Sequence, residues 1–341
     1  MPTEPLRDAV RRLARRESLS TVQSAAAFRA VMAGDGTPAL IAALLAALRV
    51  KGETADEIAG AALALREAMT VLEAADAEAL VDTCGTGGGV VGTFNISTAA
   101  ALVAAGAGVR IAKHGNRSFT TKCGSADVLE ALGVAIDIPM ERMAGVLDAA
   151  GIVFMFAPTM HPAMRHVGPV RRELGIETVM NMVGPLANPA RAGRQVVGVS
   201  DPARAELMAG ALAALGTVHS LVVHGEPGMD EISPMGRTTV IEVRGATVTR
   251  WAIDPIALGF ETAAANDLAG GNPAENAAVI DAVLNGAGNA GATAAVLLNA
   301  AAAIYVSGRA PTLEAALESA RESVSSGNAL AALNRLRRAT S

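Results

Sequence analysis

Short apolar runs that alternate with alanine-rich helical segments fill the chain from Leu80 onward. The runs have the length and the Val and Ile content of buried strands; they lie at residues 80–84, 109–112, 152–157, 194–200 and 218–225. This alternation predicts an α/β fold with a central, mostly parallel sheet that is flanked by helices. Residues 238–253 hold two more β-rich runs that Gly245 separates, which predicts a hairpin at one edge of the sheet.

The first 75 residues have a different pattern, in which apolar residues recur at helical spacing without any strand run. Two helix starts carry the pattern of a capping box: Ser20 with Gln23, and Thr54 with Glu57. We therefore predict a small all-helical N-terminal domain, residues 1–75, joined by helices from about 161–182, and a larger α/β domain, residues 76–341. Within the joining segment, one helix is expected over residues 161–174. Four more helices are expected to cover the sheet, beginning near Asn272, Asn289, Thr312 and Asn328.

Composition excludes several classes of partner and site. The formal net charge is −5 and the chain has one Trp and one Tyr, so nucleic acid is not an expected partner. No apolar stretch approaches the roughly 20 residues of a membrane span, and the charged N-terminus lacks the apolar core of a signal peptide. We therefore expect a cytoplasmic protein without a membrane partner. Cys84 and Cys123 are too few for a disulfide framework, and we interpret them as reduced thiols.

Residues 83–126 contain no Asp or Glu, although the whole chain is acidic. The same stretch holds four cationic residues, Arg110, Lys113, Arg117 and Lys122. Its charge is therefore opposite to that of the chain, which favours binding of a polyanion such as a phosphate. A glycine cluster, residues 85–89, follows the first predicted strand in this stretch. Glycines there allow positive φ angles and expose backbone N–H groups to an anion.

Three of these glycines, Gly87, Gly89 and Gly92, match the GxGxxG pattern of dinucleotide-binding loops. The context does not fit, because no helix begins at once and no acidic residue follows about 20 positions later. A Walker A loop is excluded because no Gly-Lys-Ser/Thr closes the cluster. Two hypotheses are left: a phosphate-binding loop that leads to a helix capped by Ser97, or a flexible turn before an alanine-rich helix. The polar neighbours favour the first: Asn95, Ser97, Thr98 and Lys113.

Ordered motifs over almost the whole chain resemble those of the anthranilate phosphoribosyltransferases. They read CGTGGG, TFNISTAAA, AKHGNRS, GSADVLEALG, HPAMRHVGPVRRELG, NMVGPLANP and HGEPGMDEIS. The resemblance implies transfer of phosphoribosyl from 5-phosphoribosyl 1-pyrophosphate to the amine of anthranilate, in tryptophan biosynthesis. It also implies magnesium as the cofactor and a homodimer formed through the helical domain. Catalysis of this kind depends on electrostatic stabilisation and positioning, because an arylamine is already neutral at pH 7.

The resemblance also implies roles for individual residues. The donor would be bound by Gly85, Gly87, Gly88, Thr93, Asn95, Ser97, Thr98, Lys113 and Ser125. Magnesium would be bound by oxygen ligands of the type that it prefers, namely Ser97, Asp230 and Glu231. The acceptor would lie against Gly85, His114, Asn116, His161 and Arg171. Arg171 would pair with the anthranilate carboxylate, and His114 is a possible proton acceptor. Taken alone, the two acidic residues would indicate a solvated loop, and each histidine a structural residue.

Three positions depart from the family's pattern: Gly89 replaces an aspartate, Cys123 a serine and Glu177 an arginine. Loss of the aspartate is expected to alter metal dependence rather than to abolish activity. Two alternatives therefore stay open, a related phosphoribosyltransferase or phosphorylase with another aromatic acceptor, and a weakly active nucleotide-binding regulatory homologue. The segment 118–125 is expected to close over the donor.

Overall fold

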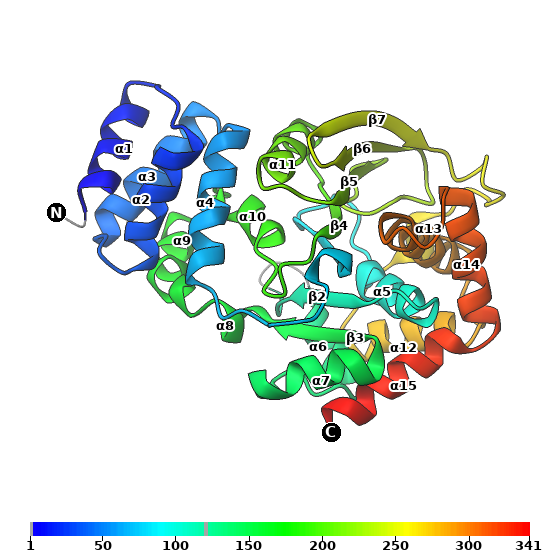
Figure 1. The fold of residues 1–341 in the computed structure, drawn as a ribbon. Helices are drawn as coiled ribbons and strands as arrows, with labels where there is room; N and C mark the ends of the chain where they lie inside the picture. The colour runs from blue at the N-terminus through cyan, green and yellow to red at the C-terminus, as the bar shows by residue number, and fades with distance from the viewer. Residues whose placement is uncertain (1–2, 119–121) are drawn as a thin grey trace.

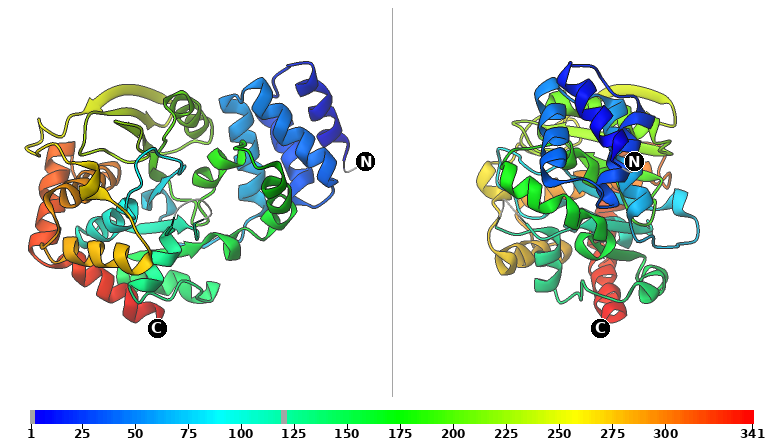
Figure 2. Two further views of the ribbon diagram at one scale, coloured as in Figure 1. Left: turned by 180° about the vertical axis from the view of Figure 1, so that it is seen from behind. Right: turned by 90° about the vertical axis from the view of Figure 1, so that its left-hand side faces the viewer.

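The computed structural model describes residues 3–118 and 122–341 and contains a helical part and a part built on one sheet (Figure 1). The helical part lies at one end of the molecule and the sheet with its own helices at the other, as the left view of Figure 2 also shows. This arrangement confirms the predicted fold class. Within the described ranges, no helix is both long enough and apolar enough to span a membrane.

Four helices form the N-terminal part: α1 (Glu4–Ala14), α2 (Thr21–Met32), α3 (Pro38–Lys51) and α4 (Ala55–Ala68). Both predicted capping boxes are present, at Ser20 and Thr54. Glu57 is fully buried and accepts hydrogen bonds from the backbone N–H groups of Leu19 and Thr54, both at 2.9 Å. It also pairs with Lys51 at 3.0 Å. This one carboxylate therefore links the start of α2, the end of α3 and the start of α4.

A seven-stranded sheet has the order β3-β2-β1-β4-β5-β6-β7. Its strands are β1 (Val81–Gly85), β2 (Ile111–Gly115), β3 (Ile152–Phe156), β4 (Arg194–Gly198), β5 (His219–Gly225), β6 (Thr238–Arg244) and β7 (Thr247–Ile253). The first five strands in chain order run parallel, and β6 and β7 form the predicted antiparallel hairpin at the edge. Because β1 lies between β2 and β4, the carboxyl ends of these three strands meet at one edge of the sheet.

Alternate residues along the strands pack into two separate cores, because successive side chains of a strand point to opposite faces. Val196 packs with the C-terminal helices, and its neighbour Val197 packs with α1–α4. The helices of the sheet part are α5 (Ile96–Gly106), α6 (Ser125–Ala131), α7 (Met140–Ala150), α11 (Pro202–Ala214), α12 (Pro273–Leu284), α13 (Ala290–Val306), α14 (Leu313–Ser325) and α15 (Asn328–Thr340). The last four begin where the sequence predicts them.

The segment that was expected to form one helix over residues 161–174 is broken. It contains α8 (Ala157–Met160), a 3₁₀ turn over Pro162–His166 and α9 (Gly168–Leu174), and α10 (Met180–Val183) follows. Pro162 and Pro169 explain the breaks, since proline has no N–H and restricts the residue before it. Val167 and Val170 are buried in the same core as α1–α4, so the segment packs against the N-terminal helices.

Candidate active site

The glycine loop after β1 is held by side chains from two distant segments. The Gly87 N–H donates to Asp230 Oδ2 at 2.8 Å, and Ser200 Oγ donates to the Gly87 carbonyl at 2.9 Å. Gly87 and Gly88 have φ angles of +72° and +80°, in the left-handed region that other residues rarely adopt. The predicted loop is therefore a defined structure, not a flexible turn, and its glycines are required by the backbone.

Two glycines allow the loop that carries Asp230 to approach the strand ends. A Cβ atom on Gly85 would overlap Asp230 Oδ2, and one on Gly198 would overlap the Asp230 carbonyl oxygen. Gly198 therefore excludes a side chain, and a side chain at Gly85 would require the Asp230 carboxylate to move. Gly85 was predicted as a site residue, whereas Gly198 was not. The signal for Gly198 is a glycine that ends a valine-rich strand run.

Helix α5 begins at Ile96, and its N-cap residue is Asn95. The sequence predicts Ser97 as the cap, and this prediction is wrong. Ser97 lies in the first turn, where its N–H donates to Glu231 Oε1 at 3.1 Å. Thr98 is buried, and its Oγ1 has no hydrogen-bond partner. The Ile96, Ser97 and Thr98 N–H groups are bonded to the Phe94 carbonyl, Glu231 and the Asn95 carbonyl, so the α5 start offers a phosphate the Ser97 hydroxyl and the positive end of the helix dipole.

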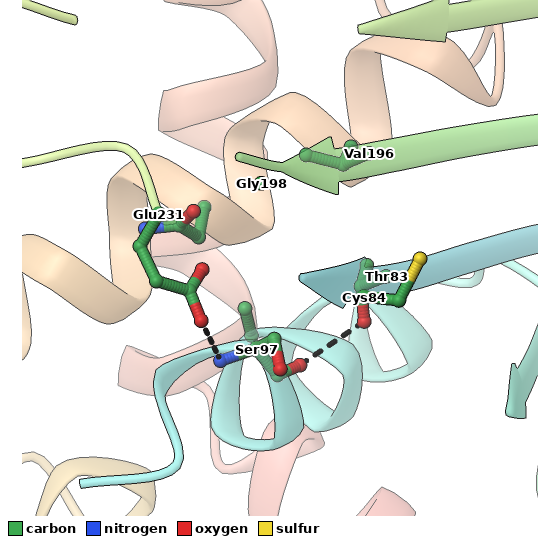
Figure 3. Close-up of a pocket in the computed structure, with 8 residues that line it drawn as sticks. Thr83, Cys84, Ser97, Val196, Gly198 and Glu231 are labelled. Carbon is green, nitrogen blue, oxygen red and sulfur yellow. Dashed lines mark hydrogen bonds between the residues drawn. The ribbon is translucent and has the colours of Figure 1, made fainter. Parts of the chain in front are cut away.

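Asp230 and Glu231 lie beside this helix start (Figure 3 shows Glu231 facing Ser97). Burial raises the pKa of Asp230; burial, followed by the neighbouring Asp230 charge, raises the pKa of Glu231 to about 8. Their loop is fixed from α13, because Asn299 exchanges two hydrogen bonds of 2.9 Å with the Ile232 backbone. In the described ranges no three His, Cys, Asp or Glu side chains converge on one point. A cation here would therefore need hydroxyl or substrate oxygens as well.

Lys113, in the middle of β2, is almost completely buried, and its side chain reaches the same helix start. Its Nζ donates to the Thr83 carbonyl at 2.5 Å and lies 3.3 Å from Ser97 Oγ. Burial lowers its pKa, and the fully buried Asp82 opposes that effect. Asp82 in turn accepts a hydrogen bond of 2.7 Å from Asn188. Thr83, Asp82 and Asn188 were not predicted, although Asp82 is the residue that borders the acid-free stretch.

Three other predicted residues are held by backbone contacts. Ser125 Oγ donates to the Asn116 carbonyl at 3.3 Å, which connects the start of α6 to the end of β2. The Asn116 side chain accepts from the Arg117 N–H at 2.8 Å. Thr93 forms an isolated bridge with Ala269. Residues 119–121 of the segment that was expected to close over the donor lie outside the described residues.

His114 and His161 form a pair, with their Nε2 atoms 3.2 Å apart and their ring centroids 4.8 Å apart. Burial is the main cause that lowers both pKa values, to about 3 for His114 and about 4 for His161. Both rings are therefore neutral at pH 7, and one Nε2 donates while the other accepts. Residues from the end of β2 and the end of α8 are thus brought together as the sequence predicts.

Arg171 lies on α9, and its Nη2 donates to Asn181 Oδ1 at 3.3 Å. Asn181 Oδ1 also accepts from the Thr178 N–H at 3.2 Å. Across the described ranges, no carboxylate lies within ion-pair distance of Arg171, and no hydrogen bond joins it to the histidine pair. Burial partly desolvates the Arg171 guanidinium and lowers its pKa. In the described ranges no carboxylate compensates its charge, and its side chain makes one hydrogen bond, to Asn181.

A cavity of about 210 Å³ connects the surroundings of Arg171 to the glycine loop. Its lining residues are mostly polar: Thr86, Gly87, Gly88, Glu177, Asn181, Ser200, Asp201 and Arg204. Glu177 pairs across this cavity with Arg204 of α11 at 2.8 Å. Asn181 and Arg204 were not predicted as site residues, although Asn181 begins the NMVGPLANP motif. The departure at Glu177 therefore lies on the wall of this cavity, between the segment after α9 and helix α11.

The other two departures lie on the donor side. A Cβ atom on Gly89 would be 3.2 Å from the Gly228 carbonyl oxygen and 3.3 Å from Asp230 Oδ1. An aspartate there would place a third carboxylate beside Asp230 and Glu231. Cys123 lies behind the α5 start, where its Sγ donates to Asn95 Oδ1 at 3.3 Å.

The chain matches two family models over most of its length. The model of the glycosyl transferase family a/b domain matches residues 77–330, and that of the family's helical bundle domain matches residues 7–69. Anthranilate phosphoribosyltransferase of Roseiflexus sp. (strain RS-1) is 51% identical over 333 residues, 97% of each chain. That of Rubrobacter xylanophilus is 50% identical over 330 residues, which cover 97% of this chain and 96% of the relative.

Solved structures give the same result for the fold. The anthranilate phosphoribosyltransferase of Thermus thermophilus has a TM-score of 0.92 and 43% identity, covering 98% of this chain and 99% of that one. The enzyme of Saccharomyces cerevisiae, in complex with PRPP and Mg, has a TM-score of 0.89 and 28% identity, covering 98% of this chain and 97% of that one. This chain belongs to the anthranilate phosphoribosyltransferase family.

Proposed function

We propose that this protein transfers phosphoribosyl from 5-phosphoribosyl 1-pyrophosphate to the amine of anthranilate and releases pyrophosphate. The observation that carries the proposal is the meeting of the glycine loop, the α5 start and a buried lysine at one sheet edge, with an uncompensated arginine across a cavity. The first three groups suit a diphosphate, and the arginine suits a carboxylate. The relatives supply the substrate names: one yeast structure holds PRPP and Mg, and another holds 4-fluoroanthranilate.

The donor would lie on the glycine loop and the α5 start. We assign its contacts to Gly85, Gly87, Gly88, Thr93, Asn95, Ser97, Thr98, Lys113 and Ser125. As the bond between the anomeric carbon and pyrophosphate breaks, negative charge grows on the leaving group. Lys113 and the positive end of the α5 dipole would stabilise that charge from fixed positions, and one such interaction contributes about 10²–10³ in rate in other enzymes.

Magnesium fits the residues beside this site. Asp230 and Glu231 are neighbouring carboxyl groups whose pKa values are raised, mainly by burial, so a bound cation would favour their ionised forms. Together with the Ser97 hydroxyl they form a set of hard oxygen ligands, which Mg²⁺ supplements with substrate phosphates. When bound, the ion supplies positive charge to the phosphate oxygens. Asp230 has a second task, because its Oδ2 holds the Gly87 N–H.

The acceptor would lie between Arg171 and the histidine pair, against Gly85 and Asn116. Arg171 would bind the carboxylate of anthranilate, whose amine is neutral and needs no strong base before attack. A pKa of about 3 makes His114 a weak base but keeps it neutral, so it can orient the amine as a hydrogen-bond acceptor. It would take the amine proton only after the new C–N bond has formed.

An assay of the purified chain with anthranilate, the phosphoribosyl donor and magnesium tests the proposal. We expect the fluorescence of anthranilate to fall and pyrophosphate to appear in equal amounts, and neither change to occur without the donor. Absence of both signals at high enzyme concentration would contradict the proposal.

A different aromatic acceptor is the second hypothesis, and Glu177 is the observation that favours it. This carboxylate lies on the wall of the cavity beside Asn181, where the family tends to have an arginine. A screen of aromatic amines and heterocycles distinguishes the two hypotheses. If a compound without a carboxylate has a higher kcat/KM than anthranilate, the acceptor has been assigned wrongly.

A weakly active regulatory protein is the third hypothesis, and it rests on Gly89. The variant Gly89→Asp restores the family's aspartate within 3.3 Å of Asp230 Oδ1, measured from the Cβ position. We expect the parent to be active and the variant to reach half-maximal activity at a different magnesium concentration. Identical magnesium curves would remove any role of Gly89 in metal dependence, and an inactive parent with an active variant would favour the regulatory hypothesis.

The proposal also includes the domain division, the assembly and the location of the protein. We assign residues 1–75, with the segment at about 161–182, to a helical domain that forms a homodimer in the cytoplasm. The exposed Val22 and Val50 provide apolar surface on α2 and α3 for such a contact. Sedimentation of the protein and of a Val22→Asp variant tests the dimer, and a monomeric parent would contradict it.

A further inference from the structure

Asn95, at the start of α5, has a side-chain amide whose two ends face different neighbours. Its Oδ1 accepts a hydrogen bond of 2.9 Å from Nδ2 of Asn276, on α12. Its Nδ2 donates to the Cys123 carbonyl at 3.3 Å, and the Cys123 thiol donates to Oδ1 at the same distance. The oxygen is therefore turned toward α12, and the second N–H of the amide is left for a ligand.

The direction of this amide is determined by a backbone group that cannot reverse. Asn276 Oδ1 accepts from the Gly271 N–H at 2.7 Å. A backbone N–H only donates, so the Asn276 oxygen must face Gly271 and its NH₂ group must face Asn95. The Asn95 oxygen must then face Asn276. Asn276 is 2% exposed, so solvent offers it no alternative partner.

Gly271 is itself held close to the donor loop. The neighbouring Gly270 N–H donates to the Gly92 carbonyl at 3.1 Å, and the Phe94 N–H donates to the Leu268 carbonyl at 2.9 Å. These bonds join residues 268–271 to the segment that leads into α5. The contacts from Gly271 through Asn276 to Asn95 therefore connect α12 to the segment that leads into α5.

We infer that Asn276 is a positioning residue, which keeps the Asn95 amide turned so that it donates its N–H to the phosphate oxygens of the donor. The inference rests on the proposed function, in which Asn95 contacts pyrophosphate. An amide turned the other way would present its oxygen to an anion, and the attraction would become repulsion. A hydrogen bond to a charged group contributes about 1.5–3 kcal/mol, so loss of the correct orientation is expected to weaken donor binding roughly 10- to 100-fold.

The variant Asn276→Asp tests this inference, because it preserves shape and still accepts from Gly271 but cannot donate to Asn95. We expect the KM for the donor to rise roughly 10- to 100-fold and the KM for anthranilate to stay within about twofold. Asn276→Ala, which leaves Asn95 free to turn, should have a smaller effect on the donor. Asn285→Asp, at the exposed end of the same helix, is the matched control and should change neither KM.

A double-variant cycle separates positioning from a purely structural role. In an Asn95→Ala background the amide is absent, so Asn276→Asp should raise the donor KM by no more than about twofold further. Effects that multiply in the double variant would overturn the inference. If Asn276→Asp does not fold, the same cycle is run with Asn276→Ala.

Calorimetric titration with the donor alone keeps this test distinct from the test of the proposed function. If the parent does not bind the donor with magnesium present, the proposed function fails. If the parent binds it and the Asn276 variants bind it equally well, the proposed function stands and the positioning role is wrong.

Discussion

The donor side of the site and the acceptor side differ in how they are built and in how their charges balance. The donor side lies at the ends of adjacent strands of one sheet, and it combines the backbone of the glycine loop with side chains of the α5 start, Lys113 and the loop of Asp230 and Glu231. The acceptor side combines the end of β2 with the broken segment after β3, which packs on the N-terminal helices. Its groups are side chains: a histidine pair and an arginine.

The difference in charge follows the difference in construction. On the donor side, Asp230 and Glu231 have raised pKa values and Lys113 a lowered one, so each charge there is costly in the free protein. On the acceptor side, both histidines are neutral and only Arg171 is charged. Under the proposed assignment, a ligand and a cation would stabilise the donor side, whereas the acceptor side would select by shape and one charge.

The largest effect is expected from Glu231→Gln, which removes one charge from the donor side and preserves the Ser97 contact. Activity should fall by about 10²–10³, because one fixed group that acts on the leaving group is lost. The melting temperature of the free protein should stay equal or rise, since Gln removes the cost of burying a carboxyl group whose pKa is raised, mainly by burial, to about 8. Activity assays and calorimetry check both results, with the exposed Glu261→Gln as control. A drop in both activity and stability would mean that the carboxylate is structural.

Arg171 gives the corresponding test on the acceptor side. Arg171→Gln should raise the KM for anthranilate by about 10- to 100-fold, the value of a hydrogen bond to a charged group. The KM for the donor should change by no more than about twofold. Arg172→Gln, on the exposed neighbour, is the matched control in steady-state assays. Equal increases in both KM values would show that the two sides are not separate.

The sequence indicates the conformation of the glycine loop better than the long-range contacts of the site, because the loop depends on local backbone chemistry. The glycines of the loop mark positive φ angles and close approaches, and both are properties of single positions. The error at Ser97 has a non-local cause. Asn95 occupies the cap position while its side chain bonds to Asn276, which lies 181 residues away and cannot be inferred from the loop.

The other residues that sequence reasoning missed have the same character. Asp82 contacts Asn188 across 106 residues, and Ile232 contacts Asn299 across 67. Asn188 and Ile232 lie within motifs that carry the resemblance, but a motif does not tell which distant residue each one contacts, so only the packed fold reveals the pairing. The break over residues 161–174 could have been foreseen, because Pro162 and Pro169 stand within the segment that was expected to be one helix.

The neutral histidine pair predicts how stability depends on pH. The pKa values of His114 and His161 are lowered from 6.5 to about 3 and about 4, so the unfolded chain binds these protons first. Stability is complete above pH 6.5 and falls as the pH drops toward 4 and 3, by about 1.4 kcal/mol per pH unit for each histidine. Urea unfolding between pH 7.5 and 5 measures the slope. His161→Gln should make the free energy of unfolding depend less steeply on pH. An unchanged slope would show that the histidine pair does not cause this pH dependence.

The smallest effect is expected where the two sides meet, at the pair between Glu177 and Arg204. Glu177 is 56% exposed in its side chain, and such pairs contribute at most about 1 kcal/mol. Glu177→Gln should therefore change the KM for anthranilate by no more than about fivefold, through the Thr178 and Asn181 contacts that hold Arg171.

Salt provides the check on this last prediction, because a partly exposed ion pair is screened and a neutral contact is not. The KM of the parent for anthranilate should depend on potassium chloride more steeply than that of Glu177→Gln. Glu173→Gln, on the exposed face of α9, should behave like the parent. If Glu177→Gln changes the KM for the donor instead, the glycine loop rather than Arg171 receives the effect, since Gly88 lies beside this carboxylate. Glu177 would then belong functionally to the donor side and not to the acceptor side.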